Sequence, residues 1–392
     1  MKRFSDREKK YVLDVLKNEF RTSKNSKYNN LFEERLSNLF ETKYTIGQVN
    51  GTTTMHTALA AGNVKPGDEV IVTPLTMSST SLCVLHNGSI PVFADVNPKT
   101  FNIDPNSIRK LINNKTKAVI TVSLYGLPTD CKEIYDICKE NNILLIEDNA
   151  ESFMSIYNGK PLGTYCDFAS YSFQASKHIT CGEGGALTTN SRELADAARR
   201  FTSLGYSTVN AKKGKITKEE VQSPYFSRHV SLGFNFRMSE LNAAALLGQL
   251  DHWEELIEQR IKVAKIYDDV ISQSNLFSPQ FCPEGYKNTY WAYTVLMNTE
   301  NPKKDWADFR KIFMNNGGEG YYGAWKLTYF EPLFLNEIQN YKGVYQRFES
   351  GLCPNAEFVQ PRLLQLKTNY WNIDEAHKQA EIFSQSINEF EG

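Results

Sequence analysis

The sequence predicts an α/β protein with a mostly parallel central sheet and a smaller second domain. Short apolar runs recur along the first half of the chain with helix-like stretches between them, which is typical of strands that helices cover on both faces. The length of 392 residues also exceeds the roughly 250 to 300 residues at which a single hydrophobic core stops growing. We therefore expect a large domain at residues 1–250 and a smaller α+β domain at residues 251–392.

The predicted strands of the large domain are short and mostly apolar. In chain order they are Glu69–Val72, Ile90–Val96, Ala118–Leu124, Ile143–Glu147, Phe168–Phe173 and Ala186–Thr189. Apolar residues at helical spacing predict helices between them at Asp104–Asn113 and Lys132–Asn141.

The pattern changes after the last of these strands. From Ser239 to about Gln273, apolar residues recur with a helical period, which predicts one long helix bridging the two domains. Thr289–Met297 then reads as an aromatic strand, and the shorter mixed segments that follow suit a smaller α+β domain.

Composition excludes several classes of protein. The net charge of -1 argues against a nucleic-acid protein, which needs a clustered basic surface. The seven cysteines include no C-x-x-C pair, and the six histidines show no metal-ligand spacing, so neither a disulfide framework nor a metal site is expected. No eighteen apolar residues run together, and no apolar signal core follows Met1. We expect a cytoplasmic protein without a membrane segment.

Lys177 is the most informative residue for chemistry. It ends the strand-like run Ser172-Phe173-Gln174-Ala175-Ser176-Lys177 and comes just before the tight turn Gly182-Glu183-Gly184-Gly185. Burial and nearby positive groups lower the pKa of a lysine, so its amine becomes nucleophilic near neutrality. Such an amine can form a Schiff base with pyridoxal 5'-phosphate (PLP), which makes the chain a candidate transaminase.

Asp148 ends the apolar run Leu144-Leu145-Ile146-Glu147-Asp148. Ligands of open α/β sheets bind at the carboxyl ends of strands, where this carboxylate can keep the pyridine nitrogen of PLP protonated. A strand-terminal Asp is more often a helix cap or a turn former. The presence of Lys177 downstream favours the interpretation of Asp148 as a cofactor ligand.

Two further segments have the character of phosphate ligands. Asn50-Gly51-Thr52-Thr53-Thr54 precedes a helix-like stretch, and backbone amides at a helix amino terminus bind phosphate, although a Thr-rich cap is the ordinary alternative. Ser172 lies five residues before Lys177 and can reach the same phosphate. Gly233-Phe234-Asn235-Phe236-Arg237-Met238 is a compact aromatic and polar segment whose Asn235 and Arg237 are either functional or structural.

Other signatures are missing or open to two interpretations. No dinucleotide-binding, P-loop, zinc-protease or G-x-S-x-G motif is found. The polar, lysine-rich stretch from Tyr206 to His229 is a solvated surface insertion or, alternatively, a flap over a phosphorylated substrate.

Four segments together resemble the DegT-type (DegT/DnrJ/StrS-like) PLP-dependent nucleotide-sugar aminotransferases. They are Asn50-Gly51-Thr52, the run Glu147-Asp148-Asn149-Ala150-Glu151, Ser172-Phe173 with Lys177 and the glycine turn, and the Asn235 segment. Their order and spacing fit this family from about Asn30 to Trp371. The resemblance implies a fold-type I PLP-dependent transferase that forms a homodimer with active sites at the subunit boundary. It implies amino transfer from L-glutamate to a keto group of a nucleotide-activated sugar, in the biosynthesis of amino sugars or of surface polysaccharide such as lipopolysaccharide.

The resemblance also implies a role for each matching residue. Lys177 becomes the Schiff-base lysine and proton shuttle, and Asp148 becomes the partner of the pyridine nitrogen. The implied phosphate ligands are Thr52 and Thr53 beside Gly51, Ser172, and Asn235, the last of these reaching the cofactor of the neighbouring subunit.

Two positions depart from the family pattern. Met77 falls where many relatives place an aromatic ring against the cofactor face, which a thioether also covers, though less rigidly. Glu151 falls where relatives usually have Gln or His next to the cofactor's phenolic oxygen, so a carboxylate there would be protonated or water-bridged.

Three alternatives to a sugar aminotransferase remain. One branch of the family replaces the lysine with histidine and dehydrates a ketosugar, but here the lysine is present and His178 follows it. The others are an aminotransferase acting on a cyclitol or another ketone, and a non-catalytic PLP-binding regulator on the same fold.

Overall fold

The computed structural model describes residues 2–18, 26–207, 218–299 and 305–392. Its centre is a sheet in which the described residues form seven strands in the order β1-β9-β8-β5-β4-β2-β3. The strands are β1 (Tyr44–Gln48), β2 (Glu69–Val72), β3 (Ile90–Phe93), β4 (Thr116–Val122), β5 (Leu144–Asp148), β8 (Phe168–Ser172) and β9 (Gly185–Thr189). Neighbours from β3 to β8 pair in parallel, whereas β9 runs antiparallel to both β8 and β1. The predicted mostly parallel sheet is confirmed.

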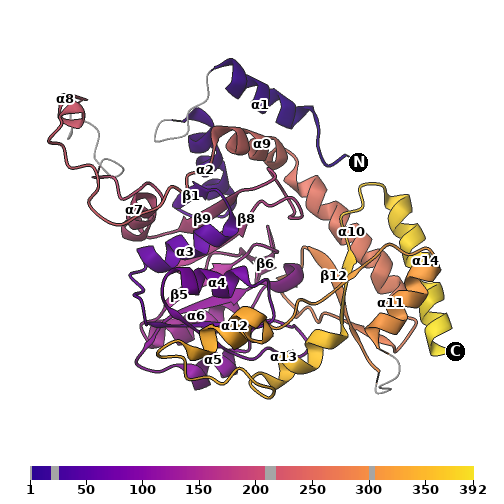
Figure 1. Ribbon diagram of the computed structural model, residues 1–392. Coiled ribbons are helices and arrows are strands. Elements are labelled where there is room, and N and C mark those ends of the chain that lie inside the picture. The colour runs from indigo at the N-terminus through magenta and orange to yellow at the C-terminus, as the bar shows by residue number, and fades with distance from the viewer. Residues whose placement is uncertain (1, 19–25, 208–217, 300–304) are drawn as a thin grey trace.

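Helices cover both faces of this sheet (Figure 1). They are α3 (Gly51–Ala61), α4 (Ser79–His86), α5 (Pro105–Leu111), α6 (Cys131–Glu140) and α7 (Arg192–Phe201). Alternate residues of a strand point to opposite faces. Accordingly, Val70 and Val72 of β2 pack with Leu59 of α3, while Ile71 packs with Ile108 and Ile134 of the opposite layer.

The predicted single helix from Ser239 to about Gln273 is wrong, because two helices occupy this stretch. α9 (Glu240–Leu250) ends before His252, whose backbone angles of φ -149 and ψ 27 are not helical, and α10 (Trp253–Ile271) begins after it. α9 packs against α1 (Asp6–Lys17) and α2 (Lys27–Leu39), whereas α10 runs on to a different core. An apolar stripe of helical period carries no mark of such a short break.

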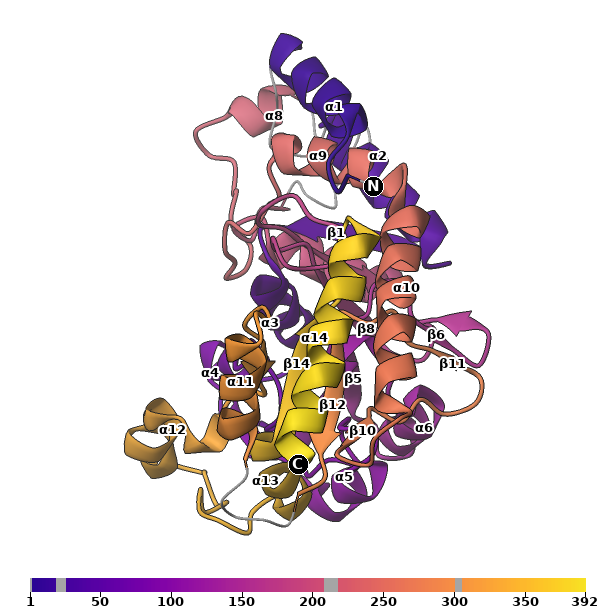
Figure 2. The same ribbon diagram turned by 90° about the vertical axis from the view of Figure 1, so that its right-hand side faces the viewer.

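A second, antiparallel sheet lies in the carboxy-terminal part. Its order is β10 (Phe277–Pro279), β12 (Ala292–Met297), β14 (Leu363–Lys367) and β13 (Tyr322–Gly323). Figure 2 shows α14 (Ile373–Glu391) beside α10 in front of this sheet, and α11 (Trp306–Asn315) also packs against α14. The expected strand Thr289–Met297 begins three residues later than predicted, at Ala292. The mixed α+β character agrees with the sequence, while the boundary at residue 250 stays a prediction.

The carboxy-terminal chain also returns to the large sheet. The segment with α12 (Pro332–Asn336) and α13 (Pro354–Val359) covers the edge strand β3. Gln346 bonds both backbone groups of Phe93, at 2.7 Å to its N–H and 3.0 Å to its C=O, which blocks further strand pairing at this edge. The Thr328 N–H bonds Pro74 C=O at 3.0 Å and so anchors the loop after β2.

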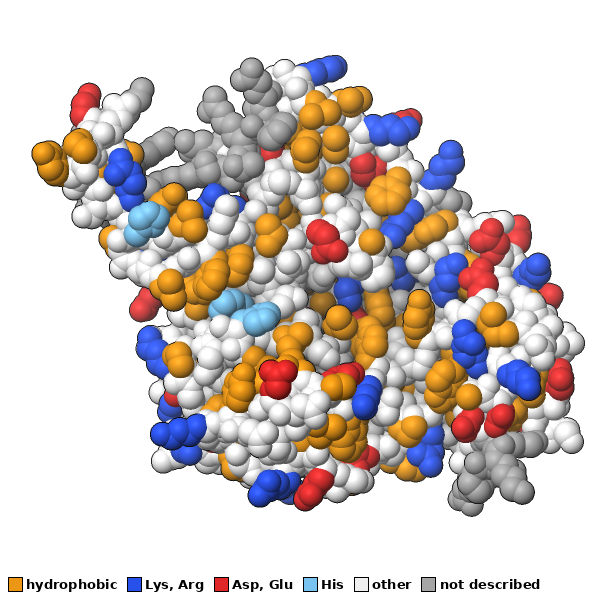
Figure 3. Space-filling view, in the orientation of Figure 1, with side chains coloured by type: hydrophobic (Ala, Val, Ile, Leu, Met, Phe, Trp, Pro, Cys, Tyr) orange, Lys and Arg blue, Asp and Glu red, His pale blue; other side chains and the backbone are white. Residues whose placement is uncertain are grey.

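Smaller elements complete the described chain. A three-stranded sheet joins β6 (Ile156–Tyr157), β7 (Lys160–Pro161) and β11 (Tyr286–Lys287), and short α8 (Lys218–Gln222) lies apart from the main body in Figure 1. On the face in Figure 3, basic and acidic side chains of the described residues are interspersed, without one broad positive patch. No helix in the described ranges is both long and apolar enough to cross a membrane.

Candidate active site

A cavity of about 400 Å³ opens where the parallel strands end and α3 begins. Its position at the carboxyl ends of β4, β5 and β8 is where open α/β sheets bind ligands. The predicted site residues that line it are Gly51, Thr52, Met77, Asp148, Glu151, Ser172 and Lys177. Residues that lie far apart in the sequence therefore meet in one place.

Asp148 is the buried acid of the cavity. Burial raises the pKa of this carboxyl group to about 6, against the lowering effects of hydrogen bonds and of the nearby Lys177 charge. The Ala150 N–H donates to Oδ1 at 3.2 Å, and the Thr80 hydroxyl donates to Oδ2 at 3.0 Å. These two donors fix the plane of the carboxyl group, which remains mostly ionised at neutral pH.

Lys177 lies in the loop after β8, which ends at Ser172, one residue before the predicted strand end at Phe173. Its backbone C=O accepts a hydrogen bond from Arg3 at 2.7 Å, and the adjoining Ser176 C=O accepts bonds from Arg260 at 3.3 Å and from the Trp291 indole at 3.1 Å. Burial lowers the pKa of the fully buried Arg260 to about 9, and the charge of Arg3 contributes to this lowering. Two guanidinium groups therefore hold the backbone that presents Lys177.

The side chain of Lys177 is largely shielded from water and paired. Its exposed fraction is 14%, and Nζ lies 3.4 Å from Oε1 of Glu151, whose own side chain is 4% exposed. The same amine lies 4.6 Å from the ring centre of Trp291, within the range of a cation–π interaction. The amine is thus held between a carboxylate and an aromatic face.

The amino end of α3 forms another wall. Asn50 caps the helix by accepting the Thr53 N–H at 2.9 Å, while Gly51 and Thr52 line the cavity. A Cβ at Gly185 would lie 2.5 Å from the backbone of Asn50, so only glycine allows β9 to approach this turn. Ser172 faces Gly51 from β8 and lines the same cavity.

Two predicted site residues do not line the cavity. The hydroxyl group of Thr53 donates to the Asn50 C=O at 2.9 Å, so this side chain supports the turn. Asn235 is exposed and forms a β-bridge with Ser203. Part of the predicted insertion, residues 208–217, lies outside the described residues, and its flanks meet at a bridge between Tyr206 and His229.

Several site residues carry no local sequence signal. Trp291 and Trp325 line the cavity with ring centres 6.0 Å apart, although both belong to the carboxy-terminal part of the chain. Arg3, just before α1, and Arg260 of α10 both approach the Lys177 C=O, and Thr80 reaches Asp148 from α4. A single tryptophan or arginine in a sequence indicates no partner, so only an alignment or the fold reveals them.

Over residues 2–376 the sequence matches the model of the DegT/DnrJ/EryC1/StrS aminotransferase family. The chain belongs to this family. GDP-perosamine synthase from Escherichia coli O157:H7 is 33% identical over 299 residues, which cover 76% of this chain and 77% of that protein. UDP-2-acetamido-2-deoxy-3-oxo-D-glucuronate aminotransferase from Pseudomonas aeruginosa is 37% identical over 267 residues, 68% of this chain and 69% of that protein.

A solved structure agrees with this assignment. The aminotransferase from Psychrobacter cryohalolentis superimposes with a TM-score of 0.90 at 25% identity, covering 99% of this chain and 98% of that one. Membership of the DegT/DnrJ/EryC1/StrS family makes the protein a PLP-dependent aminotransferase.

The cavity fits PLP on the chemistry of its own residues. It presents one shielded amine for an aldehyde, one buried acid for a ring nitrogen, and a helix amino end for a phosphate group. β9 approaches this helix end closely at Gly185, where a Cβ would lie 2.5 Å from the backbone of Asn50. In the described ranges, no three His, Cys, Asp or Glu side chains are grouped so that they could hold a metal ion.

Proposed function

We propose that this protein transfers an amino group from L-glutamate to the keto group of a nucleotide-activated sugar. The observation that carries the proposal is the meeting of the Lys177 amine and the Asp148 carboxyl group in one cavity beside the amino end of α3. The names of the relatives from Escherichia coli and Pseudomonas aeruginosa support a nucleotide-sugar substrate. Bound PLP supplies an electron sink, so that an amino group can leave one substrate and be given to another.

Lys177 holds the cofactor and moves a proton in this proposal. Arg3 and Arg260 fix the loop backbone of Lys177, while its Nζ contacts the side chains of Glu151 and Trp291 in the cavity. A lysine amine next to the reacting carbon accepts the proton at Nζ and returns it at the neighbouring atom. Since one amine carrier serves two substrates in turn, we expect ping-pong kinetics.

Asp148 keeps the ring nitrogen protonated. With a pKa of about 6, its carboxyl group is mostly ionised at neutral pH and accepts a hydrogen bond from a protonated nitrogen. The donors Thr80 and Ala150 hold it in place. Met77 covers one side of the cavity as a flexible apolar wall.

The phosphate group of the cofactor is assigned to the amino end of α3. Gly51 and Thr52 offer backbone amides there, Ser172 offers a hydroxyl group, and Thr53 supports the turn. The exposed Asn235 is assigned to the cofactor of a neighbouring subunit, which requires a homodimer. Analytical ultracentrifugation of the purified protein tests that assembly.

The cellular setting follows from the substrate. A nucleotide-linked amino sugar is a building block for surface polysaccharide, such as lipopolysaccharide, or for other amino-sugar products. We place the enzyme in the cytoplasm, which agrees with seven cysteines that are all free thiols.

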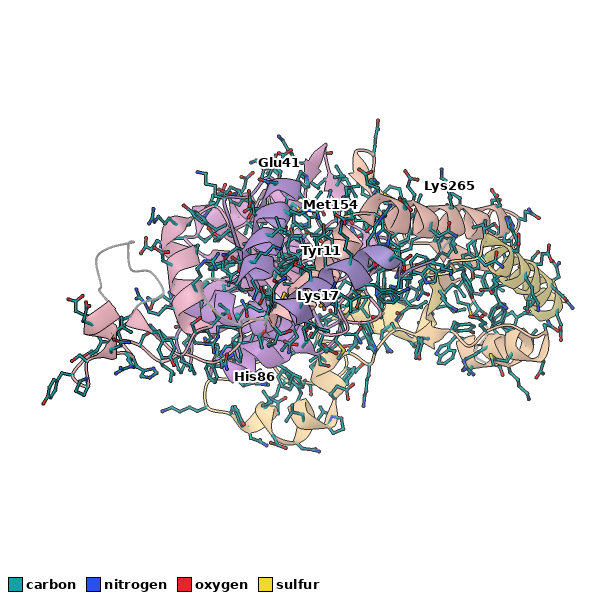
Figure 4. The ribbon with its side chains drawn as sticks, turned by 90° about the horizontal axis from the view of Figure 1, so that it is seen from above. Tyr11, Lys17, Glu41, His86, Met154 and Lys265 are labelled. Atoms are coloured by element: carbon teal, nitrogen blue, oxygen red, sulfur yellow. The ribbon has the colours of Figure 1, made fainter. Side chains whose placement is uncertain are left out.

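Removal of the Lys177 amine tests the cofactor assignment. The purified protein should show the visible absorbance band of lysine-bound PLP, and Lys177→Ala should abolish it because no amine remains to join the aldehyde. Lys265 projects from the outer face of α10 (Figure 4), so Lys265→Ala is the matched control and should keep the band. A wild type that takes up no PLP would refute the proposal.

The substrate is identified by tracing the amine. Incubation with isotope-labelled glutamate and a panel of nucleotide ketosugars should place the label in the sugar product. A sugar that loses a hydroxyl group without gaining the label would instead indicate a dehydratase. Label transfer to a cyclitol or another simple ketone, but to no nucleotide sugar, would contradict the substrate class.

A further inference from the structure

Glu151 is a buried carboxylate that directly contacts the reactive amine. It follows β5 by three residues, and its Oε1 lies 3.4 Å from Nζ of Lys177. Its other oxygen, Oε2, accepts the backbone N–H of Tyr125 at 3.1 Å. Tyr125 has a φ of 62°, a left-handed conformation that is rare for a tyrosine, and this strained turn aims the N–H at the carboxylate. Both oxygens of Glu151 are thus engaged.

The ionisable groups around Glu151 are one positively charged amine and two acids. Lys177 provides the positive charge from the loop after β8. Asp148 and the hydroxyl group of Tyr125 face it as acids: burial raises the pKa of each of these two groups, and the charge of Glu151 raises both further. In the part of the chain that the structure describes, the ion pair of Glu151 is the one with Lys177.

The ion pair between Lys177 and Glu151 must be lost before the amine can react. If Lys177 carries the cofactor, as the proposed function requires, its ammonium group must first lose a proton. A carboxylate left without its cation in a buried site costs several kcal/mol. Nζ of Lys177, which carries the proton, already contacts Oε1 of Glu151. Transfer of that proton to Oε1 therefore removes both charges at once.

We propose that Glu151 takes the proton of the Lys177 ammonium group when the amine is engaged and holds it as a carboxylic acid. One N–H bond breaks with its electron pair remaining on Nζ, and one O–H bond forms on Oε1. The net charge of the pair is zero before and after, so no proton is exchanged with solvent. Glu151 is therefore the proton store of the catalytic lysine, and its new O–H donates a hydrogen bond into the cavity.

The proton count on cofactor binding tests this role. The slope of log Kd against pH equals the number of protons exchanged on binding, by the same linkage that governs stability. For the wild type we expect a slope near zero between about pH 7 and 8, where Asp148 is already ionised and the proton of Lys177 stays in the site. In Glu151→Gln the amide accepts the Tyr125 N–H but cannot store a proton. One proton is then released, and PLP binding should tighten by about tenfold per pH unit.

A buried neighbour provides the matched control. Glu147 is also buried, but it accepts hydrogen bonds from the Gly163 N–H at 2.7 Å and from Asn149 at 3.1 Å and makes no ion pair with Lys177 among those found in the described residues. Glu147→Gln should therefore keep the slope of the wild type. Calorimetry in two buffers of different ionisation heat counts the released protons directly.

A second measurement can be read from the wild type alone if the variant fails to fold. The infrared difference spectrum of PLP binding should gain the C=O stretch of a protonated carboxyl group, and this signal should be missing in Glu151→Gln. Equal slopes for the wild type and Glu151→Gln would overturn the inference, as would a wild-type spectrum without the band if the variant fails to fold. A wild type that binds no PLP would refute the proposed function instead.

Discussion

Replacement of Asp148 by asparagine should stabilise the cofactor-free protein at neutral pH while it weakens cofactor binding. The folded protein raises the pKa of this carboxyl group from 3.8 to about 6, chiefly through burial. A raised carboxyl pKa means that the folded state binds the proton more strongly, so stability falls as pH rises from about 4 to 6 and stays low above that range. A shift of about two units corresponds to about 3 kcal/mol of lost stability above pH 6.

The amide of the Asp148→Asn variant carries no charge and escapes this cost. The replacement removes one of the two oxygens that accept hydrogen bonds from Thr80 and Ala150, which costs about 1 kcal/mol of stability. The net gain in the free energy of unfolding is therefore about 2 kcal/mol. For 392 residues, the unfolding entropy is about 0.8 kcal/mol per degree, so the Tm should rise by about 2 to 3 °C. At about pH 5 roughly half of this cost remains, so the net gain should shrink to less than about 1 kcal/mol, and it should vanish near about pH 4.5.

Thermal unfolding of the cofactor-free proteins at about pH 5 and pH 7.5 measures this effect. PLP at 100 times its Kd should then add about 2.7 kcal/mol to the wild type and less to Asp148→Asn, which reverses the order of the two melting temperatures. Asp136→Asn removes a half-exposed carboxylate that pairs with Lys132 and should leave the pH dependence unchanged. The same Tm difference between variant and wild type at both pH values would refute the reasoning.

Two further substitutions probe the walls of the cavity. Gly185→Ala places a Cβ 2.5 Å from the backbone of Asn50 and should displace the amino end of α3, costing about 1 to 3 kcal/mol of stability. The Kd for PLP should rise by about tenfold or more, whereas Gly182→Ala, which has open space around its Cβ, should alter only stability. An unchanged Kd in Gly185→Ala would contradict the assignment of the phosphate site. Thr80→Val removes the hydroxyl group that donates to Oδ2 of Asp148 at 3.0 Å, and loss of about 1 kcal/mol raises the pKa of Asp148 by almost one unit. Because the proposed role of Asp148 requires its ionised form, the acid limb of the kcat/KM profile should lie at higher pH in this variant than in the wild type. An acid limb at the same pH in both proteins would argue against that role.

The central sheet was predictable because strands buried on both faces leave a continuous apolar run in the sequence. Glu69–Val72 matches β2 at both ends, and the other predicted strands differ from the structure by a few residues. β1 was missed because Tyr44–Gln48 is short and includes Gly47 and Gln48, which weaken a strand pattern. The break between α9 and α10 was missed because so short an interruption leaves the apolar period almost intact.

The candidate site likewise contains some residues that the sequence revealed and others that it did not. Asp148, Lys177 and the Gly51 turn were found because each stands near the end of a recognisable strand or at the start of a helix. The neighbouring residues Arg3, Thr80 and Trp291 were not found, because their contacts join residues far apart along the chain. Arg3 and Lys177, for example, are 174 positions apart in the sequence.

The sequence by itself determined the α/β class, the family and the lysine that lines the cavity, since these depend on local periodicity and on ordered motifs. The tertiary structure alone decided that Glu151 faces the Lys177 amine and that two arginines hold the loop of this lysine. Those contacts result from how helices and strands from distant parts of the chain pack around the ends of the sheet. Such packing is fixed by the free energy of the whole core, and no segment of the sequence records it on its own.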